Sequence, residues 1–213
     1  MPVNDQPIIR RATRNDTPLI ARTIWLAEHT GIELYSYGSL FDLSYETFIK
    51  RFSELLKNDE PGHGLTWKSF WIAEINHEAA GCVALYREGE NGSSSLLMTG
   101  LLMEHFTRQE VASAFAKLEA FRSVHIVQTN GNYQLDSGAT FAPHHGKRIF
   151  GSIFNHAYKE LSMEHPAVVE AQVWMKNDHA KKVYVGLGFI ERYQKEYNAS
   201  GMGRLLMTKE PIQ

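Results

Sequence analysis

Residues 132–175 contain a strand, a loop, a helix and a second strand in succession, and this stretch constrains the fold most. NYQLDSGATFA has the composition of a strand, and AVVEAQVWM is an apolar run typical of a buried strand. Between them, apolar residues from Ile149 to Leu161 recur along one broad helix face. This strand–helix–strand unit favours a fold in which helices pack on a sheet.

Two hairpin patterns accompany this unit. FWIAEINHEAAGCVALYRE contains two apolar strands around a short polar turn, and RYQKEYNA with GRLLMTK forms a second pair. A short strand, PIIRRAT, comes first, and Thr13 with Asp16 gives the signature of a helix start. Apolar periodicity predicts helices in four further places: about 17–31, about 44–57, an insertion at about 96–125, and a short helix ending at Gly188. We expect one domain over residues 1–213 with a mixed α/β, or α+β, layered structure.

The charge and the cysteine count limit the classes of partner and compartment. A net charge of −2 provides no field that attracts nucleic acid or an anionic membrane, and no nucleic-acid motif is recognisable. The single cysteine, Cys82, lies in an apolar run typical of a buried core thiol, and a chain without disulfides fits a reducing cytoplasm. No apolar run approaches the ~18 residues of a membrane span, and MPVNDQP lacks the features of a signal peptide. We expect a cytoplasmic protein whose residues 1–7 are flexible.

Three segments resemble the GNAT superfamily of acyl-CoA-dependent N-acyltransferases. IIRRATRND is similar to the superfamily's first strand and helix, and YQLDSGATFAPHHGKRIFGSIFNHA to its fourth strand, pyrophosphate loop and following helix. NDHAKKVYVGLGF fits the pattern N-x-x-A-x-x-φ-Y-x-x-L-G-F, with φ apolar, at every fixed position. The resemblance implies a mostly antiparallel sheet of six to seven strands with helices on both faces, splayed between strands four and five. It also implies acetyl-CoA (coenzyme A) as co-substrate and an amine of a small molecule or peptide as acceptor.

The predicted pyrophosphate loop departs from the superfamily pattern Q/R-x-x-G-x-G/A. Amides at a helix N-terminus attract anions, and glycines let a diphosphate approach them. The pattern falls here on His145, Gly146, Lys147, Arg148, Ile149 and Phe150; with a one-residue insertion, Gly151 serves as the second glycine. Three interpretations stay open: the cations replace the access that glycines gave, Phe150 belongs to the helix core, or the cofactor site is altered or lost.

Two residues are candidates for proton transfer. The resemblance places Tyr184 near the cofactor sulfur, where a phenol with a pKa near ~10 can protonate the leaving thiolate; the alternative is an aromatic ring packed in the core. The resemblance makes Asp136 a general base, because several members carry an acidic residue at this strand position; the alternative is a carboxylate paired with a lysine or a backbone amide. Gly138, two residues on, suggests a β-bulge or a close backbone approach.

Further cofactor contacts follow from the resemblance. Asn177 would contact the pantetheine arm as well as capping its helix, and Ala180 would be small so that the cofactor can pass. Backbone groups of Ala139, Thr140 and Phe141 would bind the pantetheine in the manner of an added strand.

The sequence constrains the acceptor and the assembly less. Acidic and aromatic residues of the segment 28–46 would suit a cationic amine, or are loop residues that are solvated or tucked inward: Glu28, Glu33, Tyr35, Tyr37, Phe41, Asp42 and Tyr45. The histidines match no zinc spacing, so we expect no metal. The insertion either covers the acceptor site or forms an oligomer contact, which leaves a homodimer open. The alternative to an acetyltransferase, supported by Arg148 and Phe150, is a degenerate GNAT-like domain that binds a ligand or partner without catalysis.

Overall fold

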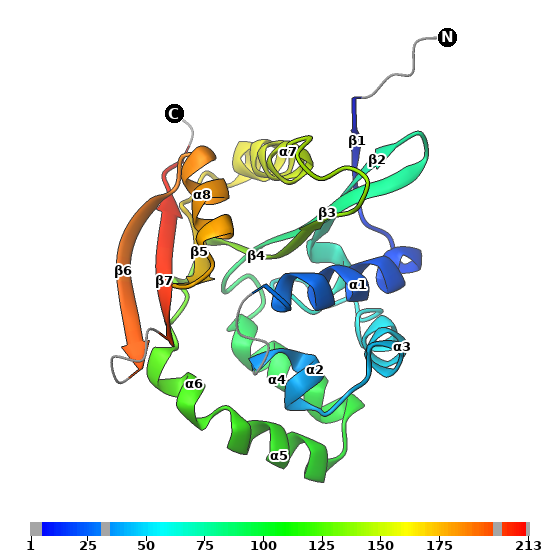
Figure 1. Ribbon diagram of the computed structural model, residues 1–213, viewed down its shortest axis with the longest axis vertical. Helices are drawn as coiled ribbons and strands as arrows, with labels where there is room; N and C mark the ends of the chain where they lie inside the picture. Colours follow the sequence, from blue (N-terminus) through cyan, green and yellow to red (C-terminus); the bar gives the residue numbers. More distant parts are fainter. Residues whose placement is uncertain (1–5, 31–34, 198–201, 212–213) are drawn as a thin grey trace.

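The computed structural model describes residues 6–30, 35–197 and 202–211 (Figure 1). The expectation that residues 1–7 are flexible falls mainly on residues 1–5, which lie outside this set. No helix in the described ranges is long and apolar enough to cross a lipid bilayer.

A seven-stranded mixed sheet with the strand order β1-β2-β3-β4-β5-β7-β6 forms the centre of the molecule. Among the strands that the structure describes, only β4 and β5 pair in parallel, so the prediction of a mostly antiparallel sheet of six to seven strands is confirmed. The strands are β1 (Ile8–Arg11), β2 (Phe70–Ile75), β3 (Glu78–Arg87), β4 (Tyr133–Thr140), β5 (Val169–Trp174), β6 (Ile190–Tyr197) and β7 (Met202–Lys209).

Helices cover both faces of the sheet, with α7 on one face and α1 and α3 on the other (Figure 1). The helices are α1 (Thr17–Glu28), α2 (Tyr37–Leu40), α3 (Tyr45–Leu55), α4 (Ser94–His105), α5 (Arg108–Lys117), α6 (Glu119–Val124), α7 (Ile149–Glu164) and α8 (Asp178–Gly186), with 3₁₀ turns at Arg14–Asp16 and Trp67–Ser69. The predicted helix at about 17–31 ends earlier, at Glu28, and the sequence pattern missed the single turn of α2.

Side-chain alternation along β3 divides the core into two clusters. Cys82 and Ala84 join the cluster beneath α1 and α3, whereas Val83 and Leu85 join the cluster beneath α7. Burial raises the pKa of the Cys82 thiol to about 12, because desolvation disfavours the thiolate. The prediction of a buried core thiol is therefore confirmed.

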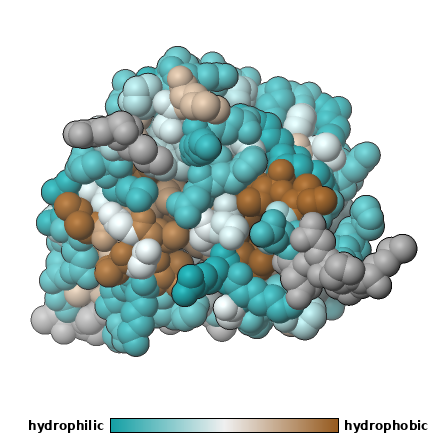
Figure 2. All heavy atoms as spheres, turned by 90° about the horizontal axis from the view of Figure 1, so that it is seen from above, coloured by the Kyte–Doolittle hydropathy of each residue, from teal (hydrophilic) through white to brown (hydrophobic). Residues whose placement is uncertain are grey.

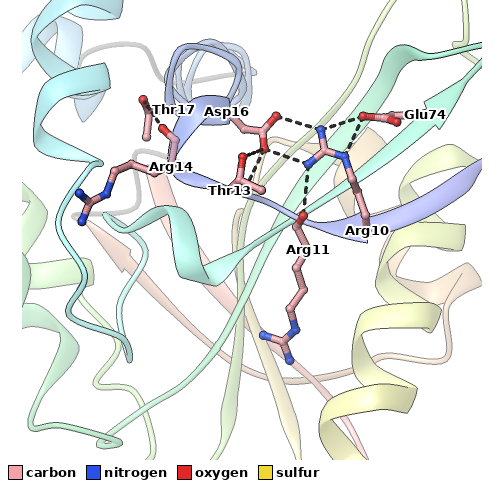
Figure 3. Close-up of polar contacts among 7 residues, drawn as sticks. All are labelled: Arg10, Arg11, Thr13, Arg14, Asp16, Thr17 and Glu74. Carbon is pink, nitrogen blue, oxygen red and sulfur yellow. Dashed lines mark hydrogen bonds and ion pairs between the residues drawn. The ribbon is translucent and has the colours of Figure 1, made fainter.

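The junction between β1 and α1 is held by the predicted capping residues and by one arginine (Figure 3). The Thr13 side chain and the Asp16 carboxylate form a capping box over the 3₁₀ turn that precedes α1. Arg10 donates to Asp16 at 2.8 Å and 2.9 Å, and to Glu74 on β2 at 2.8 Å. Partial burial alone would raise the pKa of Asp16, but hydrogen bonds from Arg10 and Thr13 bring it below its usual value.

β4 and β5 diverge after a short paired stretch. Their pairing ends with Leu135 opposite Ala171, whereas β4 continues alongside β3 to Thr140. We call the divergence beyond Leu135 and Ala171 the β4–β5 fork. The predicted splay between strands four and five is confirmed.

A β-bulge lies on β4 where the fork begins. Val83 on β3 pairs with Gly138, and Leu85 pairs with Leu135, so β4 contains one more residue than β3 in this interval. The extra residue falls at positions 136–137, next to the predicted general base. The bulge suggested by Gly138 is thus present.

The predicted insertion at about 96–125 appears as α4, α5 and α6, which leave and rejoin the sheet at one place. The amide of Glu88 donates to the carbonyl of Asn132, and the amide of Gly131 donates to the carbonyl of Glu88, both at 2.8 Å. Between these points the chain passes α3, α2 and finally β6 (Figure 1). Ion pairs fix it there, from Arg51 to Glu110 and from Lys117 to Asp42. It therefore lies on the α1 face of the sheet.

Candidate active site at the β4–β5 fork

The N-terminus of α7 presents backbone amides beside basic side chains. The first turn of α7 begins at Ile149, and the amide of Ser152 is the first to donate back into the turn, to the carbonyl of Arg148 at 3.0 Å. The amides of Ile149, Phe150 and Gly151 therefore precede the helical hydrogen-bond ladder. The loop residues before them are exposed: His145, Gly146, Lys147 and Arg148. Amides, helix dipole and cations together suit a diphosphate.

Arg148 adopts a left-handed backbone conformation, with φ 58° and ψ 24°, as the N-cap of α7. The superfamily pattern has a glycine at this position, and a glycine reaches this conformation without steric cost. An arginine here strains the backbone, because its Cβ crowds the following carbonyl. A glycine at position 148 would adopt the same conformation without that strain.

Replacing Arg148 by Gly is expected to stabilise the protein relative to Arg148→Ala by about 1 kcal/mol, because both remove the cation and only Gly relieves the left-handed strain. Urea unfolding of the two variants measures the difference. Lys147→Gly next to Lys147→Ala is the matched control for the general cost of glycine. Equal stability of R148G and R148A would contradict the argument.

The ring of Phe150 bridges β4 and α8 at the fork. A Cβ placed on Gly138 would lie 2.5 Å from Phe150 Cε2, so the glycine is what admits the ring. On its other side the ring lies 6.0 Å from the ring of Tyr184, centroid to centroid. Phe150 is partly buried against the α7 core cluster. Gly151 instead faces Leu187, 3.1 Å from where its Cβ would be, so it serves helix packing.

The free edge of β4 offers fewer backbone groups to a ligand than the resemblance implies. The amide of Phe141 donates to Ala80 on β3 at 2.8 Å, so the backbone groups of Phe141 and, by alternation, Ala139 face β3. Those of Thr140 face the fork, where the Nε2–H of His145 donates to the Thr140 carbonyl at 2.8 Å. Of the three predicted pantetheine contacts, Thr140 alone points its backbone the required way.

α8 brings Tyr184 to the fork. Its ring packs on Phe150 and on Phe189, and burial raises the pKa of the phenol, with a smaller contribution from the charge of Asp136. The phenol therefore keeps its proton at any working pH. Ala180, on the same helix, is partly buried against the α7 core cluster.

Asn177 caps α8 and also ties it to α1. Its Oδ1 accepts from the amide of Ala180 at 3.0 Å, as expected of an N-cap. Its Nδ2 donates to Thr30 Oγ1 at 3.0 Å, just beyond the end of α1. This contact joins elements on opposite sides of the fork, and no pattern in the sequence predicts it.

Asp136 lies at the bulge, accessible to solvent yet partly enclosed. A Cβ on Gly64 would lie 2.6 Å from Asp136 Oδ2, so the loop containing Gly64 closes over the carboxyl. Desolvation raises the pKa of Asp136, and the charge of Arg204 partly opposes the rise. A carboxyl with a raised pKa suits a general base that must also release its proton.

Glu28, Tyr37 and Arg204 lie close enough to Asp136 for its charge to contribute to their pKa shifts. Desolvation raises the pKa of Glu28 well above its usual value, Asp136 adds to the rise, and Arg204 opposes it. Glu28 Oε2 also accepts from the amide of Tyr37 at 3.0 Å. Glu28, Tyr37, Asp136 and Arg204, from α1, α2, β4 and β7, are called the charge cluster below.

The structure separates the residues of segment 28–46 into two groups. Tyr35 stacks on Trp174 with ring centroids 5.7 Å apart, so with Glu28 and Tyr37 it lies near the fork. Three others make contacts away from the fork: Phe41 packs on Phe106, Asp42 pairs with Lys117, and Tyr45 packs on Trp25. Glu33 lies outside the described residues. Among the described side chains, no group of three His, Cys, Asp or Glu is placed to hold a metal ion.

Comparison of this chain with family models and with curated protein sequences finds no match. Solved structures do match. An N-acetyltransferase from Staphylococcus aureus Mu50 superposes with a TM-score of 0.68 at 17% identity, covering 95% of this chain and 100% of that one.

Two further structures agree. The histone acetyltransferase HPA2 and related acetyltransferase from Corynebacterium glutamicum gives 0.60 at 14% identity, covering 97% of both chains. The GNAT-family acetyltransferase from Streptococcus pneumoniae gives 0.52 at 13% identity, covering 96% of this chain and 98% of that one. Similarity of this extent at such low identity establishes architecture, and this chain has the GNAT acetyltransferase fold.

Proposed function

We propose that this protein is an N-acetyltransferase that transfers an acetyl group from acetyl-CoA to a primary amine of a small molecule or peptide. One observation carries the proposal: the anion-binding turn of α7 and the carboxyl of Asp136 lie at the two ends of the same diverging β4 edge. Thr140 lies four positions after Asp136, which corresponds to about 13 Å of strand. A ligand held by its diphosphate at α7 and extended along this edge would end near Asp136 and Tyr184.

The loop residues fit a diphosphate through charge rather than through glycine access. His145, Lys147 and Arg148 would contact phosphate oxygens beside the amides of α7, and the Thr140 amide would bind the arm within the fork. Acetyl-CoA, when bound, supplies an activated acyl thioester.

Asp136 and Tyr184 supply the proton transfers of direct attack in a ternary complex. Asp136, directly or through a water, takes a proton from the acceptor nitrogen, whose lone pair forms the new N–C bond. The O–H of Tyr184 donates a proton to the sulfur as the C–S bond breaks. A backbone N–H of β4 polarises the carbonyl oxygen. Each group acts on a different atom, so one variant can remove each role.

The position of Phe150 is the observation that favours a second candidate, a GNAT-like domain that binds a ligand or partner without catalysis. Its ring occupies the space between Gly138 and Tyr184, beside the path that the thioester arm would follow. The enzyme remains our primary proposal because the other expected groups are all present next to the ring: the basic turn, the fork, Tyr184 and Asp136.

A thermal-shift titration with acetyl-CoA tests the cofactor assignment. A ligand at 100 times its Kd adds about 2.7 kcal/mol, which for a chain of this length raises Tm by roughly 5–10 °C. Lys147→Ala with Arg148→Ala is expected to weaken the shift, and Lys182→Ala, on the exposed side of α8, is the control. A shift that occurs in Phe150→Ala and not in the wild type would support the second candidate. No shift in either of these two proteins at millimolar acetyl-CoA would end the cofactor assignment.

A further inference from the structure

The strands beyond the fork present basic and aromatic side chains toward the charge cluster. Trp174 on β5 pairs directly with Arg204 on β7, so their side chains share a face. The neighbours Val173 and Leu205 point the other way, into the α7 core cluster. Trp174 and Arg204 therefore lie on the face that carries α1 and α2.

Two contacts hold the guanidinium of Arg204 on this face. Its guanidinium carbon lies 4.7 Å from the centroid of the Trp174 ring, and its Nη1 donates to Gln172 Oε1 at 3.3 Å. Desolvation lowers its pKa, whereas Asp136 and Glu28 oppose the fall. A flat guanidinium fixed on an aromatic ring is well suited to bind a carboxylate through two parallel N–H groups.

Two further basic residues gather around Arg204 rather than around the carboxylates. Lys195 on β6 is the strand partner of Arg204, and its Nζ donates to the carbonyl of His125 at 2.7 Å. Burial lowers the pKa of His125, and the charges of Arg204 and Lys195 lower it further. Lys195 pairs with Arg204 across the two strands, so its positive charge adds to that of the guanidinium on this side of the fork.

The fork therefore has two chemically different sides. Glu28 from α1 and Asp136 from β4 supply carboxyl groups, while Arg204 from β7 and Lys195 from β6 supply positive charge and His125, from the loop after α6, supplies an imidazole N–H. An amine that carries a carboxylate would match both sides at once, with its nitrogen toward Asp136.

We propose that the acceptor is an amino acid or a similarly amphoteric small amine, whose carboxylate is bound by Arg204 with Lys195 and His125. The assignment rests on the acetyltransferase function proposed above. Removing the acceptor's carboxylate should therefore lower kcat/KM more than changing the acceptor's side chain does, because the carboxylate binds a desolvated guanidinium.

The test compares matched acceptors with acetyl-CoA by thiol release: tyrosine with tyramine, tryptophan with tryptamine, lysine with cadaverine. The carboxylated member of at least one pair is expected to have the higher kcat/KM, by about 10- to 100-fold. Arg204→Gln is expected to remove this preference, and the exposed Lys195→Gln to reduce it a few-fold even if R204Q fails to fold. Lys182→Gln should leave it unchanged.

Equal or better acetylation of the decarboxylated members would overturn the acceptor assignment and leave acetyl transfer standing. Acetyl-CoA binding without acetylation of any member would also overturn it. Neither a thermal shift nor thiol release would instead count against the proposed function itself.

Discussion

Replacing Asp136 by Asn lowers kcat/KM for acetyl transfer by an expected 10²- to 10⁴-fold, the range that a positioned general base contributes. The amide keeps the shape of the side chain at the bulge and cannot accept the proton from the attacking amine. Steady-state thiol release at saturating acetyl-CoA measures the loss. Ser137→Ala, at the neighbouring bulge position, is the matched control.

The pH dependence gives this prediction a second readout. Desolvation raises the pKa of Asp136, so the wild-type kcat/KM should fall as pH drops through that raised value, while the residual rate of D136N lacks this limb. The charge of Arg204 opposes the rise, so Arg204→Gln should move the limb to higher pH. An unchanged rate and profile in D136N would refute the assigned role.

The folding stability of D136N should rise, whereas its activity falls. A carboxyl whose pKa is raised on folding binds more protons in the folded state, so stability falls as pH rises from the usual value near ~3.9 through the raised one. At neutral pH the charged Asp136 therefore costs folding free energy, and D136N should unfold at higher urea than wild type. Reduced activity with increased stability is what a functional carboxyl predicts, whereas loss of both would indicate a structural role.

Replacing Tyr184 by Phe should lower kcat by about 10²-fold, at the lower end of the range for a general acid, and leave acetyl-CoA affinity nearly unchanged. The substitution keeps the ring that packs on Phe150 and Phe189, and removes only the O–H. Single-turnover rates and a separate binding titration distinguish the two effects. Tyr193→Phe, on the exposed face of β6, controls for loss of a hydroxyl elsewhere.

A different pattern would assign Tyr184 another role. Equal losses in kcat and in cofactor affinity would mean that its hydroxyl supports binding and not protonation of the leaving group. A fully active Y184F would mean that the ring matters only for packing beside Phe150.

Local patterns predicted the architecture because the elements that build the fork are strongly periodic. The broad apolar stripe of α7 follows from helix geometry, and β3 and β5 stand out as short apolar runs. Gly138 also marked the bulge, since a glycine inside a strand commonly indicates one. The motif NDHAKKVYVGLGF predicted α8 because it contains both the N-cap residue Asn177 and the residues of the helix.

The charge cluster was harder to predict, because it depends on register between distant strands. The sequence shows Trp174 and Arg204 only as members of two apolar strands, 30 positions apart, and their pairing follows from the order β5-β7. Gly64 looks like an ordinary loop glycine until Asp136 is placed beside it. Phe41 and Asp42 were candidates for binding a cationic amine on composition alone, which does not reveal that the insertion contacts them through Phe106 and Lys117.

The entry and exit of the insertion meet at Glu88, where hydrogen bonds already close the β3–β4 ladder on either side. The sheet register, the bulge and the fork are thus fixed independently of what happens between residues 89 and 130. An insertion of this kind can lengthen, shorten or be exchanged during evolution without a change in the sheet. Changes in the surface that the insertion adds over α2, α3 and β6 would therefore leave the β4–β5 fork unchanged.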